Sequence, residues 1–472
     1  MNEEREKPMS MASSTDTLTN QSERPFTFWR MLRLSSFQIG SAMGDILVTS
    51  IWNRVMITNF GIPATPVGLL IALRYLLSPL GLWAGYLSDT RPLWGFRRSS
   101  YIWLGRSMMV LSLPLLGLSL MRLDGATSDV PGWLLAFLSS LLYGLGTLIS
   151  GSPFLALVRD SAPPQKQGLA ISSVETILII FFAFVGIGFS LWMQEYSQPI
   201  FWEMVVTTML VGGFFWFFAI AGAEKRLKKG EGGATAVSPA HHPPAFLAVL
   251  RKIWQDPRTR LFFFFLTLAT MAAWAQDAIL EPFGAEVFDL PLSRTTRFNS
   301  YWQAATVVTL LAGSAIWRKR PPERQAAIAK WGLGVMALGL LVLGGTAFAH
   351  QVHLIEVALL IFGAGFGVYT FGGLSLMAVM ASDKEAGAYL GLWSIAILVS
   401  KGLGTFLGGA ARDLLLLGFD LPAGVSYAVI FALEALGLLG AIFILSRIDV
   451  VGFARDVGRV ISRTEAQIAL AD

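Results

Sequence analysis

Apolar residues occupy the chain in long runs that short polar segments interrupt, and this spacing is its dominant pattern. A helix needs roughly 20 apolar residues to cross the hydrocarbon core of a bilayer. The runs lack the strict alternation of a β-barrel strand, so they predict α-helices. Windows of sufficient length lie at residues 34–59, 63–88, 100–122, 132–158, 168–193, 198–222, 260–288, 297–317, 327–349, 353–381, 387–411 and 423–446. The pattern predicts an all-α membrane protein with twelve transmembrane helices.

A polar, basic segment divides these spans into two groups of six. It follows the sixth span and continues into a Gly/Ala/Pro-rich stretch, which is the composition of a flexible linker. Residues 156–160 and 378–383, after the fourth and tenth spans, echo each other weakly, as in carriers built from two parallel repeats. The predicted organisation is a tail with an interfacial helix at 1–33, a six-helix bundle at 34–222, a linker at 223–259, a second six-helix bundle at 260–447 and an amphipathic tail at 448–472.

Charge adds an orientation to this picture. Hydrophobic residues make up 54% of the chain and charged residues only 14%. Of the 36 Lys and Arg residues, 28 lie in the tails and in the loops that follow even-numbered spans. Basic residues are enriched on the cytoplasmic side of membrane proteins, so both termini are expected to be cytoplasmic. The remaining 8 are Arg54, Arg74, Arg106, Arg122, Arg294, Arg297, Lys401 and Arg412.

Several classes of function are not expected. The basic residues are spread over loops instead of forming one stripe, so nucleic acid is not a predicted partner. The chain has no cysteine and 4 histidines, none in the middle of a span, which argues against thiolate and histidine metal sites. It lacks a nucleophile elbow, a phosphate-binding loop and a zinc-binding helix motif, so the sequence does not indicate an enzyme. The first thirty residues also lack the apolar core of a secretory signal.

The strongest candidate site lies in the seventh span, where Gln276, Asp277 and Glu281 interrupt an apolar run just before Pro282. An ionised side chain near the middle of a bilayer costs at least a few kcal/mol, so it normally faces a partner, a polar cavity or a ligand. Asp277 and Glu281 are four residues apart and share one helix face, while Pro282 removes a backbone hydrogen bond. The segment predicts a broken helix whose acidic face points inward.

Other charged residues fall inside predicted spans. Together with Asp277 and Glu281, the acids Asp45, Glu175 and Glu434 nearly balance in number the bases Arg54, Arg74, Arg106 and Lys401, as internal ion pairing would produce. Structural pairing and ligand contact both stay open for these acids and for Arg74, Arg106 and Lys401. Glycines at GxxxG spacing in the tenth and eleventh spans indicate close helix packing; they are Gly363, Gly367, Gly404 and Gly408.

The loop after the second span carries a candidate gate. A glycine permits close helix contact, an acid four residues later can pair with an arginine or a helix N-terminus, and two arginines can anchor the loop at an anionic leaflet. Arg159 and the start of the eleventh span near Gly387 are the candidate partners of that acid; the alternative is that these charges only fix topology. The gate residues are Gly85, Asp89, Gly95, Arg97, Arg98, Arg159 and Asp160.

This loop resembles the signature loop of the major facilitator superfamily. More specifically, the chain resembles the PucC-like proteins of that superfamily, which deliver bacteriochlorophyll during assembly of light-harvesting complexes. The resemblance is carried by residues 32–40, 53–57, 85–90, 95–103 and 276–284. It implies the major facilitator fold, bacteriochlorophyll as cargo and the inner (intracytoplasmic) membrane of a photosynthetic bacterium as location. It also implies light-harvesting antenna polypeptides as partners, with the reaction centre and pigment-synthesis enzymes as further candidates.

The side chain that would hold a magnesium-centred pigment is less defined. Oxygen ligands suit a hard cation, and the candidates are a backbone carbonyl, water, Asn53, Gln276, Asp277 and Glu281, with Arg54 beside Asn53. Two other functions stay open. One is a proton-coupled transporter of a small solute, with Asp45, Asp277 or Glu281 titrating and Arg54 or Arg74 binding an anion; the other is a pigment-free scaffold for antenna helices. A transporter predicts a central aqueous cavity, whereas pigment binding predicts a lateral, lipid-facing cleft.

Overall fold

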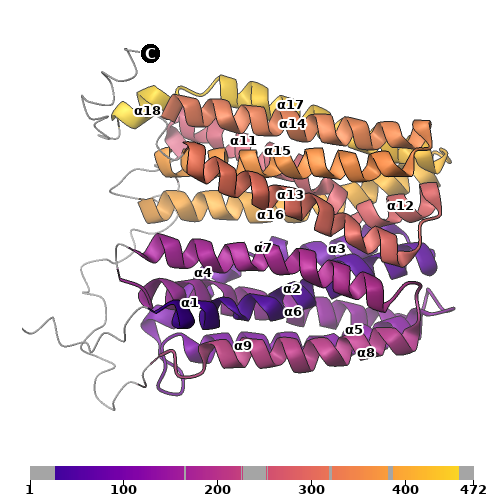
Figure 1. The fold of residues 1–472 in the computed structure, drawn as a ribbon, viewed down its shortest axis with the longest axis horizontal. Coiled ribbons are helices and arrows are strands. Elements are labelled where there is room, and N and C mark those ends of the chain that lie inside the picture. Colours follow the sequence, from indigo (N-terminus) through magenta and orange to yellow (C-terminus); the bar gives the residue numbers. More distant parts are fainter. Residues whose placement is uncertain are drawn as a thin grey trace, which may run out of the picture.

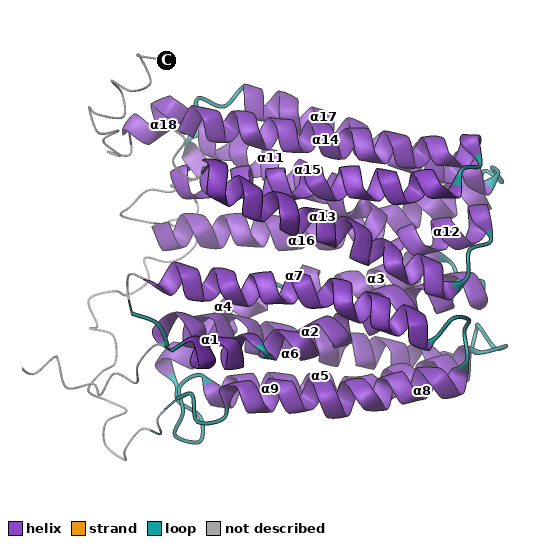
Figure 2. Cartoon of the chain, viewed as in Figure 1, coloured by secondary structure: helices purple, strands orange, loops and turns teal. Residues whose placement is uncertain are grey.

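Helices account for all long elements of the computed structural model, which describes residues 27–163, 166–224, 226, 251, 254–317, 322–380 and 386–456. Figure 1 shows them running side by side along the long axis of the molecule, and Figure 2 shows helices joined by short loops. Ten helical segments of the described chain are long and apolar enough to cross a membrane. Two further passes, at residues 37–59 and Leu292–Trp317, are also helical. The predicted all-α fold with twelve spans is confirmed.

The first pass contains wide π-helical turns, and the sixth contains another. The helices of the first half are α1 (Phe28–Ser35), α2 (Phe37–Ile46), η1 (Leu47–Trp52), η2 (Val55–Asn59), α3 (Ala64–Leu76), α4 (Pro79–Thr90), α5 (Ser99–Leu123), α6 (Val130–Asp160), α7 (Gln167–Trp192), α8 (Gln198–Thr207), η4 (Thr208–Gly212) and α9 (Gly213–Ile220). Those of the second half are α11 (Pro257–Trp274), η6 (Ala275–Ala278), α12 (Leu280–Phe288), α13 (Leu292–Trp317), α14 (Pro322–Ala349), α15 (Val352–Val379), α16 (Ala386–Asp413), η7 (Leu414–Gly418), α17 (Ala423–Ser446) and α18 (Val450–Asp456).

Each half has its own apolar core. One cluster of buried side chains joins helices of the first half and includes Leu292, and the other joins α11 to α18. The halves meet along two seams, where α3 packs against α16 and α7 packs against α13. In Figure 1 the first half lies below the second, and both described ends of the chain lie at the left. We call that end of the bundle the terminal face and the other end the opposite face.

The seventh pass is broken, as the sequence predicts, but the break precedes the proline. Helix α11 ends at Trp274, a 3-10 turn holds residues 275–278, and α12 begins at Leu280. Pro282 has no N–H to donate to the carbonyl of Ala278 four residues earlier. Asn53 of the first half donates its Nδ2 to that carbonyl instead, at 2.9 Å. The proline therefore frees an acceptor that joins the two halves.

The two tails differ from one another. Phe28 and Trp29 of α1 are 66% and 75% exposed, which suits the interfacial helix predicted there. Phe453, within the segment predicted as an amphipathic tail at 448–472, is only 2% exposed and packs in the second core, so this part of the segment belongs to the bundle. Arg258 at the start of α11 pairs with Asp456 at 2.8 Å and fastens α18 to the bundle. The rest of the predicted tail helix, after residue 456, lies outside the described residues.

Candidate functional site

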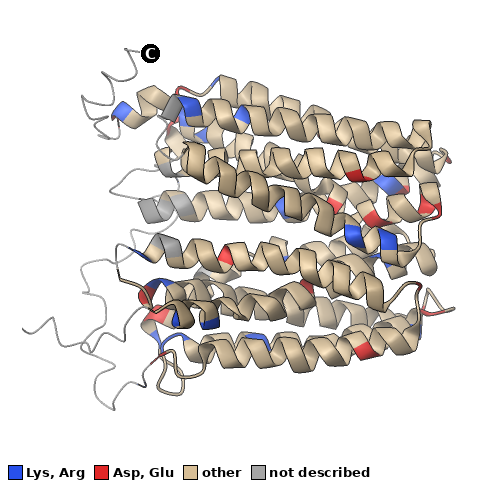
Figure 3. Cartoon of the chain, in the orientation of Figure 1, with Lys and Arg blue, Asp and Glu red and all other residues tan. Residues whose placement is uncertain are grey.

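A cavity of about 540 Å³ lies between the two halves. The first half contributes residues of α2, α3, α4, α6 and α7, and the second contributes residues of α11, η6, α13 and α16. Figure 3 shows that charged residues gather towards the ends of the bundle, so the few in its middle stand out. The ionisable acids and bases of the lining are Asp45, Arg74, Asp277 and Lys401.

Asp45 and Arg74 form a closed ion pair on the first-half side of this cavity. Arg74 Nη1 lies 2.5 Å from Asp45 Oδ1, and the hydroxyl of Tyr143 donates to the same oxygen at 2.8 Å. The guanidinium also stacks over the ring of Tyr75, 4.6 Å from its centroid. Each charge therefore has a direct partner, and the predicted intramembrane pairing is present at this position.

Lys401, on the second-half side, is held differently. Its ammonium lies 3.3 Å from the ring centroid of Trp274 and 4.5 Å from that of Tyr75. It takes part in none of the ion pairs formed by the described residues. Asp277 faces the same cavity, and Lys401 is its strongest electrostatic neighbour, ahead of Arg74. Lys401 and Asp277 thus form an open pair on the second-half wall of the cavity, where α16 packs against η6.

The other predicted ligand residues lie away from the cavity lining. Glu281 is fully buried and accepts from Asn299 Nδ2 at 2.6 Å, and Asn299 itself reaches the cavity. Arg54 donates to the carbonyl of Leu290 at 3.1 Å. Gln276 is 3% exposed, and its Oε1 has no hydrogen-bond donor among the described residues. These groups join the halves or fill the junction beside the cavity, and of the five candidates only Asp277 lines it.

Asn53 bonds to Ala278 and is fully buried, so it too belongs to the junction and not to the lining. The sequence analysis missed Asn299 and Gln303, which are four residues apart in α13 and both face the cavity. Their spacing within a predicted span is the signal that could have identified them.

Ion pairing does not explain the remaining intramembrane charges, contrary to expectation. Arg106 is 5% exposed and donates to Ser41 Oγ at 3.3 Å, and its guanidinium lies 4.2 Å from the ring centroid of Phe37. Glu434 is 4% exposed, and neither of its carboxylate oxygens is hydrogen-bonded within the described chain. Glu175 lies partly buried on α7. Aromatic faces and a hydroxyl, instead of carboxylates, accommodate the arginine.

Around these charges the described residues form a central cavity, and not the expected lateral cleft. The cavity lies between the halves and is walled by the two seams, α3 with α16 and α7 with α13. A second hollow, of about 610 Å³, lies on the outer side of α14 and is lined by residues of that one helix. The lining of that hollow consists of Ala327, Lys330, Trp331, Gly334, Val335 and Leu338. The polar and aromatic groups converge on the central cavity.

The opposite face is closed by a polar contact between the halves. Asp413, at the end of α16, accepts from the backbone N–H of Ala64 at 2.9 Å and of Thr65 at 2.7 Å, and from the Thr65 hydroxyl at 2.6 Å. These are N–H groups of the first turn of α3, which have no acceptor within their own helix. Arg412 pairs with Asp413 and with Glu286. The second half therefore caps a helix of the first.

Replacing Asp413 with alanine is expected to lower the free energy of unfolding by about 1–3 kcal/mol, because α3 loses its cap and Arg412 loses one acidic partner. Thermal unfolding of the purified protein in detergent measures this loss. Asp124→Ala, at an exposed helix end, is the matched control and is expected to leave the melting temperature unchanged. Equal losses in the two variants would show that the cap contributes nothing specific.

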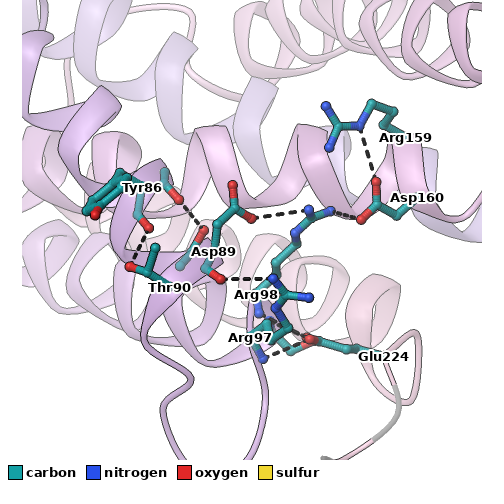
Figure 4. Close-up of polar contacts among 11 residues, drawn as sticks. Tyr86, Asp89, Thr90, Arg97, Arg98, Arg159, Asp160 and Glu224 are labelled. Atoms are coloured by element: carbon teal, nitrogen blue, oxygen red, sulfur yellow. Dashed lines mark hydrogen bonds and ion pairs between the residues drawn. The ribbon is translucent and has the colours of Figure 1, made fainter. Parts of the chain in front are cut away.

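The candidate gate at the terminal face is built around Arg98 (Figure 4). Its guanidinium lies 3.2 Å from Asp89 Oδ1 and 2.5 Å from Asp160 Oδ2. Arg159 pairs with Asp160 at 3.2 Å and does not pair with Asp89, so the expected Asp89–Arg159 contact is wrong. The 10% exposure of the Arg98 side chain also rules out its predicted role as a lipid anchor. A buried arginine between two acids forms ion pairs with both of them, whereas an arginine that contacts lipid headgroups would leave both acids without this partner.

The rest of this cluster also belongs to the first half. Arg97 donates from Nη2 to the carbonyl of Asp89 at 2.9 Å. Glu224, after the sixth pass, accepts from the backbone N–H groups of Arg97 and Ser99, both at 2.8 Å, and so caps the start of α5. Side chains at the start of α16 near Gly387 lie outside the described ones, so a contact across the halves stays a prediction.

We expect Asp89→Asn to change the free energy of unfolding by less than about 1 kcal/mol, since Asp89 is 45% exposed and exposed ion pairs contribute little. Arg98→Gln is expected to cost more, because both Asp89 and Asp160 lose a partner. Thermal unfolding of the two variants under identical conditions compares them. The reverse order would mean that Asp89, and not Arg98, organises the loop.

Most of the chain is similar to proteins of one known family. The family model described as PUCC protein matches residues 51–453. Protein PucC of Rhodovulum sulfidophilum is 28% identical over 395 residues, which cover 81% of this chain and 85% of that protein. A Rhodobacter capsulatus protein named bacteriochlorophyll synthase 44.5 kDa chain is 27% identical over 421 residues, covering 86% of this chain and 92% of that protein.

Solved structures show the same fold in transporters. A POT family transporter in complex with 5-aminolevulinic acid has a TM-score of 0.65 at 12% identity, with 91% of this chain and 96% of that chain covered. The xylose transporter XylE from E. coli, in an inward open conformation, has a TM-score of 0.60 at 15% identity, with 86% of this chain and 95% of that chain covered. At these identities the similarity concerns the arrangement of helices.

Proposed function

The chain belongs to the PucC family, and from this premise we propose that it is a membrane assembly factor that delivers bacteriochlorophyll to light-harvesting antenna polypeptides. Membership points to a role in the assembly of photosynthetic complexes and to a non-enzymatic membrane protein. The synthase name belongs to one relative, and this chain's sequence carries no motif for covalent catalysis. We further propose that the protein resides in the inner (intracytoplasmic) membrane with both termini in the cytoplasm.

The cavity is central and not the lateral cleft expected for pigment binding, so the chemistry of its lining, and not its position, carries the pigment part of this proposal. Trp274 and Trp302 present rings to it, with centroids 5.8 Å apart at an interplanar angle of 81°. Such faces suit a flat, apolar macrocycle. Gln303 adds an amide oxygen, which is a suitable ligand for the magnesium of a bacteriochlorin, whereas the amide oxygen of Asn299 accepts a hydrogen bond from Trp302 Nε1 at 3.0 Å. The cavity thus combines the two kinds of group that a pigment carrier needs.

Purification from pigmented cells tests this proposal. The wild-type protein is expected to retain bacteriochlorin absorption, and Trp302→Ala is expected to lose most of it, because a cavity wall is removed. Trp331→Ala is the matched control, since Trp331 is 74% exposed on the outer side of α14. A wild-type protein that retains antenna polypeptides but no pigment would instead identify a pigment-free scaffold. Equal pigment in both variants would exclude the cavity as the binding site.

A proton-coupled transporter of a small solute is the second candidate, and the charged central cavity is the observation that favours it. Asp277 and Lys401 both line the second-half wall of a cavity between the two halves, where a solute would bind. In proteoliposomes such a transporter would take up protons together with its solute, and Asp277→Asn would abolish this coupling. Pigment retention without any proton flux would favour delivery.

A further inference from the structure

We infer that the central cavity selects a flat, largely apolar molecule that carries a free carboxylate, which Lys401 binds. The inference rests on the proposed function and concerns the pigment as the protein receives it, before its carboxylate is esterified. A bacteriochlorin exists either as an acid with a free carboxylate side chain or as an ester of a long isoprenoid alcohol. The acid is the form that the charges of this cavity recognise.

The two cations in the cavity lining, Arg74 and Lys401, differ in how they are paired. Arg74 is paired directly with Asp45, which neutralises its charge, so Arg74 attracts an anionic ligand only weakly. Lys401 contacts the faces of Trp274 and Tyr75, which stabilise its charge but accept no conventional hydrogen bond from it. An ammonium has three N–H donors, and no hydrogen bond from Lys401 Nζ to a described residue is formed. A carboxylate would supply both the opposite charge and the acceptors.

Asp277 lines the same cavity as Lys401, and its position affects how an anionic ligand can approach Lys401. Of the charged groups around Asp277, Lys401 has the strongest electrostatic effect on it. Arg74, Asp45 and Thr405 also lie near Asp277. Because Asp277 and Lys401 are not in contact, a ligand carboxylate can approach the ammonium without displacing Asp277. The negative charge of Asp277 opposes that approach, so its removal should strengthen binding of an acid. Damage to the cavity would instead weaken binding, and the two roles are therefore separable.

The size and shape of the central cavity also favour the acid. A cavity of about 540 Å³ falls within the range of about 300–1,000 Å³ that encloses a drug-sized ligand. Phe182 and Leu398 add apolar surface beside the tryptophan rings. An isoprenoid chain would add apolar bulk to the ring system that this volume must hold, and the ester has no negative charge for Lys401. Both features favour the acid.

Binding of two probes to the full-length protein in lipid nanodiscs tests the inference. The probes are bacteriochlorophyllide, the acid, and bacteriochlorophyll, the ester, and quenching of tryptophan fluorescence reports both. We expect the acid to bind about tenfold more tightly than the ester, and Lys401→Gln to weaken the acid by about tenfold while leaving the ester unchanged. Lys401→Arg should retain the preference, and Asp277→Asn should strengthen binding of the acid alone. Lys330→Gln, on the outer side of α14, is the matched control.

The outcomes separate this inference from the proposed function. Equal affinity for acid and ester, or an unchanged acid affinity in Lys401→Gln with the wild-type melting temperature, would overturn the carboxylate preference and leave pigment delivery standing. Failure of the wild-type protein to bind either probe would overturn pigment delivery itself. Weakening of both probes in Lys401→Gln would show a structural role for Lys401 and would also overturn the inference.

Discussion

Leucine at Gly408 is expected to prevent accumulation of the folded protein, whereas leucine at Gly391 on the same helix is expected to be tolerated. A Cβ at Gly408 would overlap the carbonyl of Ala275, which is backbone and cannot rotate away. A Cβ at Gly391 would meet no atom within 4 Å. Overpacking a well-packed contact typically costs about 1–3 kcal/mol, and here α16 would also be pushed from the break in the seventh pass.

Membrane fractions of cells that express each variant, resolved by size-exclusion chromatography, measure this effect as the amount of monodisperse protein. Gly408→Ala is expected to give an intermediate yield, because a methyl group already overlaps the Ala275 carbonyl. Gly404 makes the same kind of approach to the carbonyl of Met271, so Gly404→Leu should behave like Gly408→Leu. Normal yields of Gly408→Leu would mean that the two helices separate without loss of the fold.

These contacts also show which features the sequence predicts well. GxxxG spacing and the proline of the seventh pass act within a few residues, so Gly404, Gly408 and Pro282 could be interpreted correctly from the chain alone. Length and apolarity likewise predict helical spans, because a bilayer imposes both. The position of the break could not be placed exactly, since the acceptor freed by Pro282 is satisfied by Asn53, more than two hundred residues away.

Partner choice among charged residues could not be predicted, because it depends on how helices are rotated and on which groups compete. The sequence suggested Arg159 and the start of the eleventh span near Gly387 as partners of Asp89, and the structure pairs Asp89 with Arg98, which Asp160 shares. Lys401 lies against aromatic rings and forms no ion pair with the described residues. A near balance between the numbers of acids and bases in the sequence does not reveal this arrangement. The cavity lining draws on both halves, so no single motif in the sequence marks it.

Arg74→Leu is expected to destabilise the protein by about 3–5 kcal/mol, because Asp45 is left charged and largely buried with one hydroxyl donor, from Tyr143. Replacing both members of the pair, in Asp45→Asn with Arg74→Leu, is expected to recover a large part of this loss, since no unpaired charge remains. Arg122→Leu, at an exposed helix end, is the control and should have little effect. Thermal or denaturant unfolding in detergent measures the wild type, the single variants Arg74→Leu and Asp45→Asn, the double variant and the control.

The double-mutant cycle decides between a structural pair and a ligand contact, which the sequence left open for Asp45 and Arg74. A structural pair gives coupling, so the double variant is more stable than the sum of the single losses implies. If Arg74 served mainly to bind an anionic ligand, its removal would reduce binding with little loss of stability, and the effects of the two substitutions would add. The direct contact with Asp45 and the Tyr143 hydrogen bond favour coupling. This outcome would leave Lys401 as the cation of the lining that is available to a ligand.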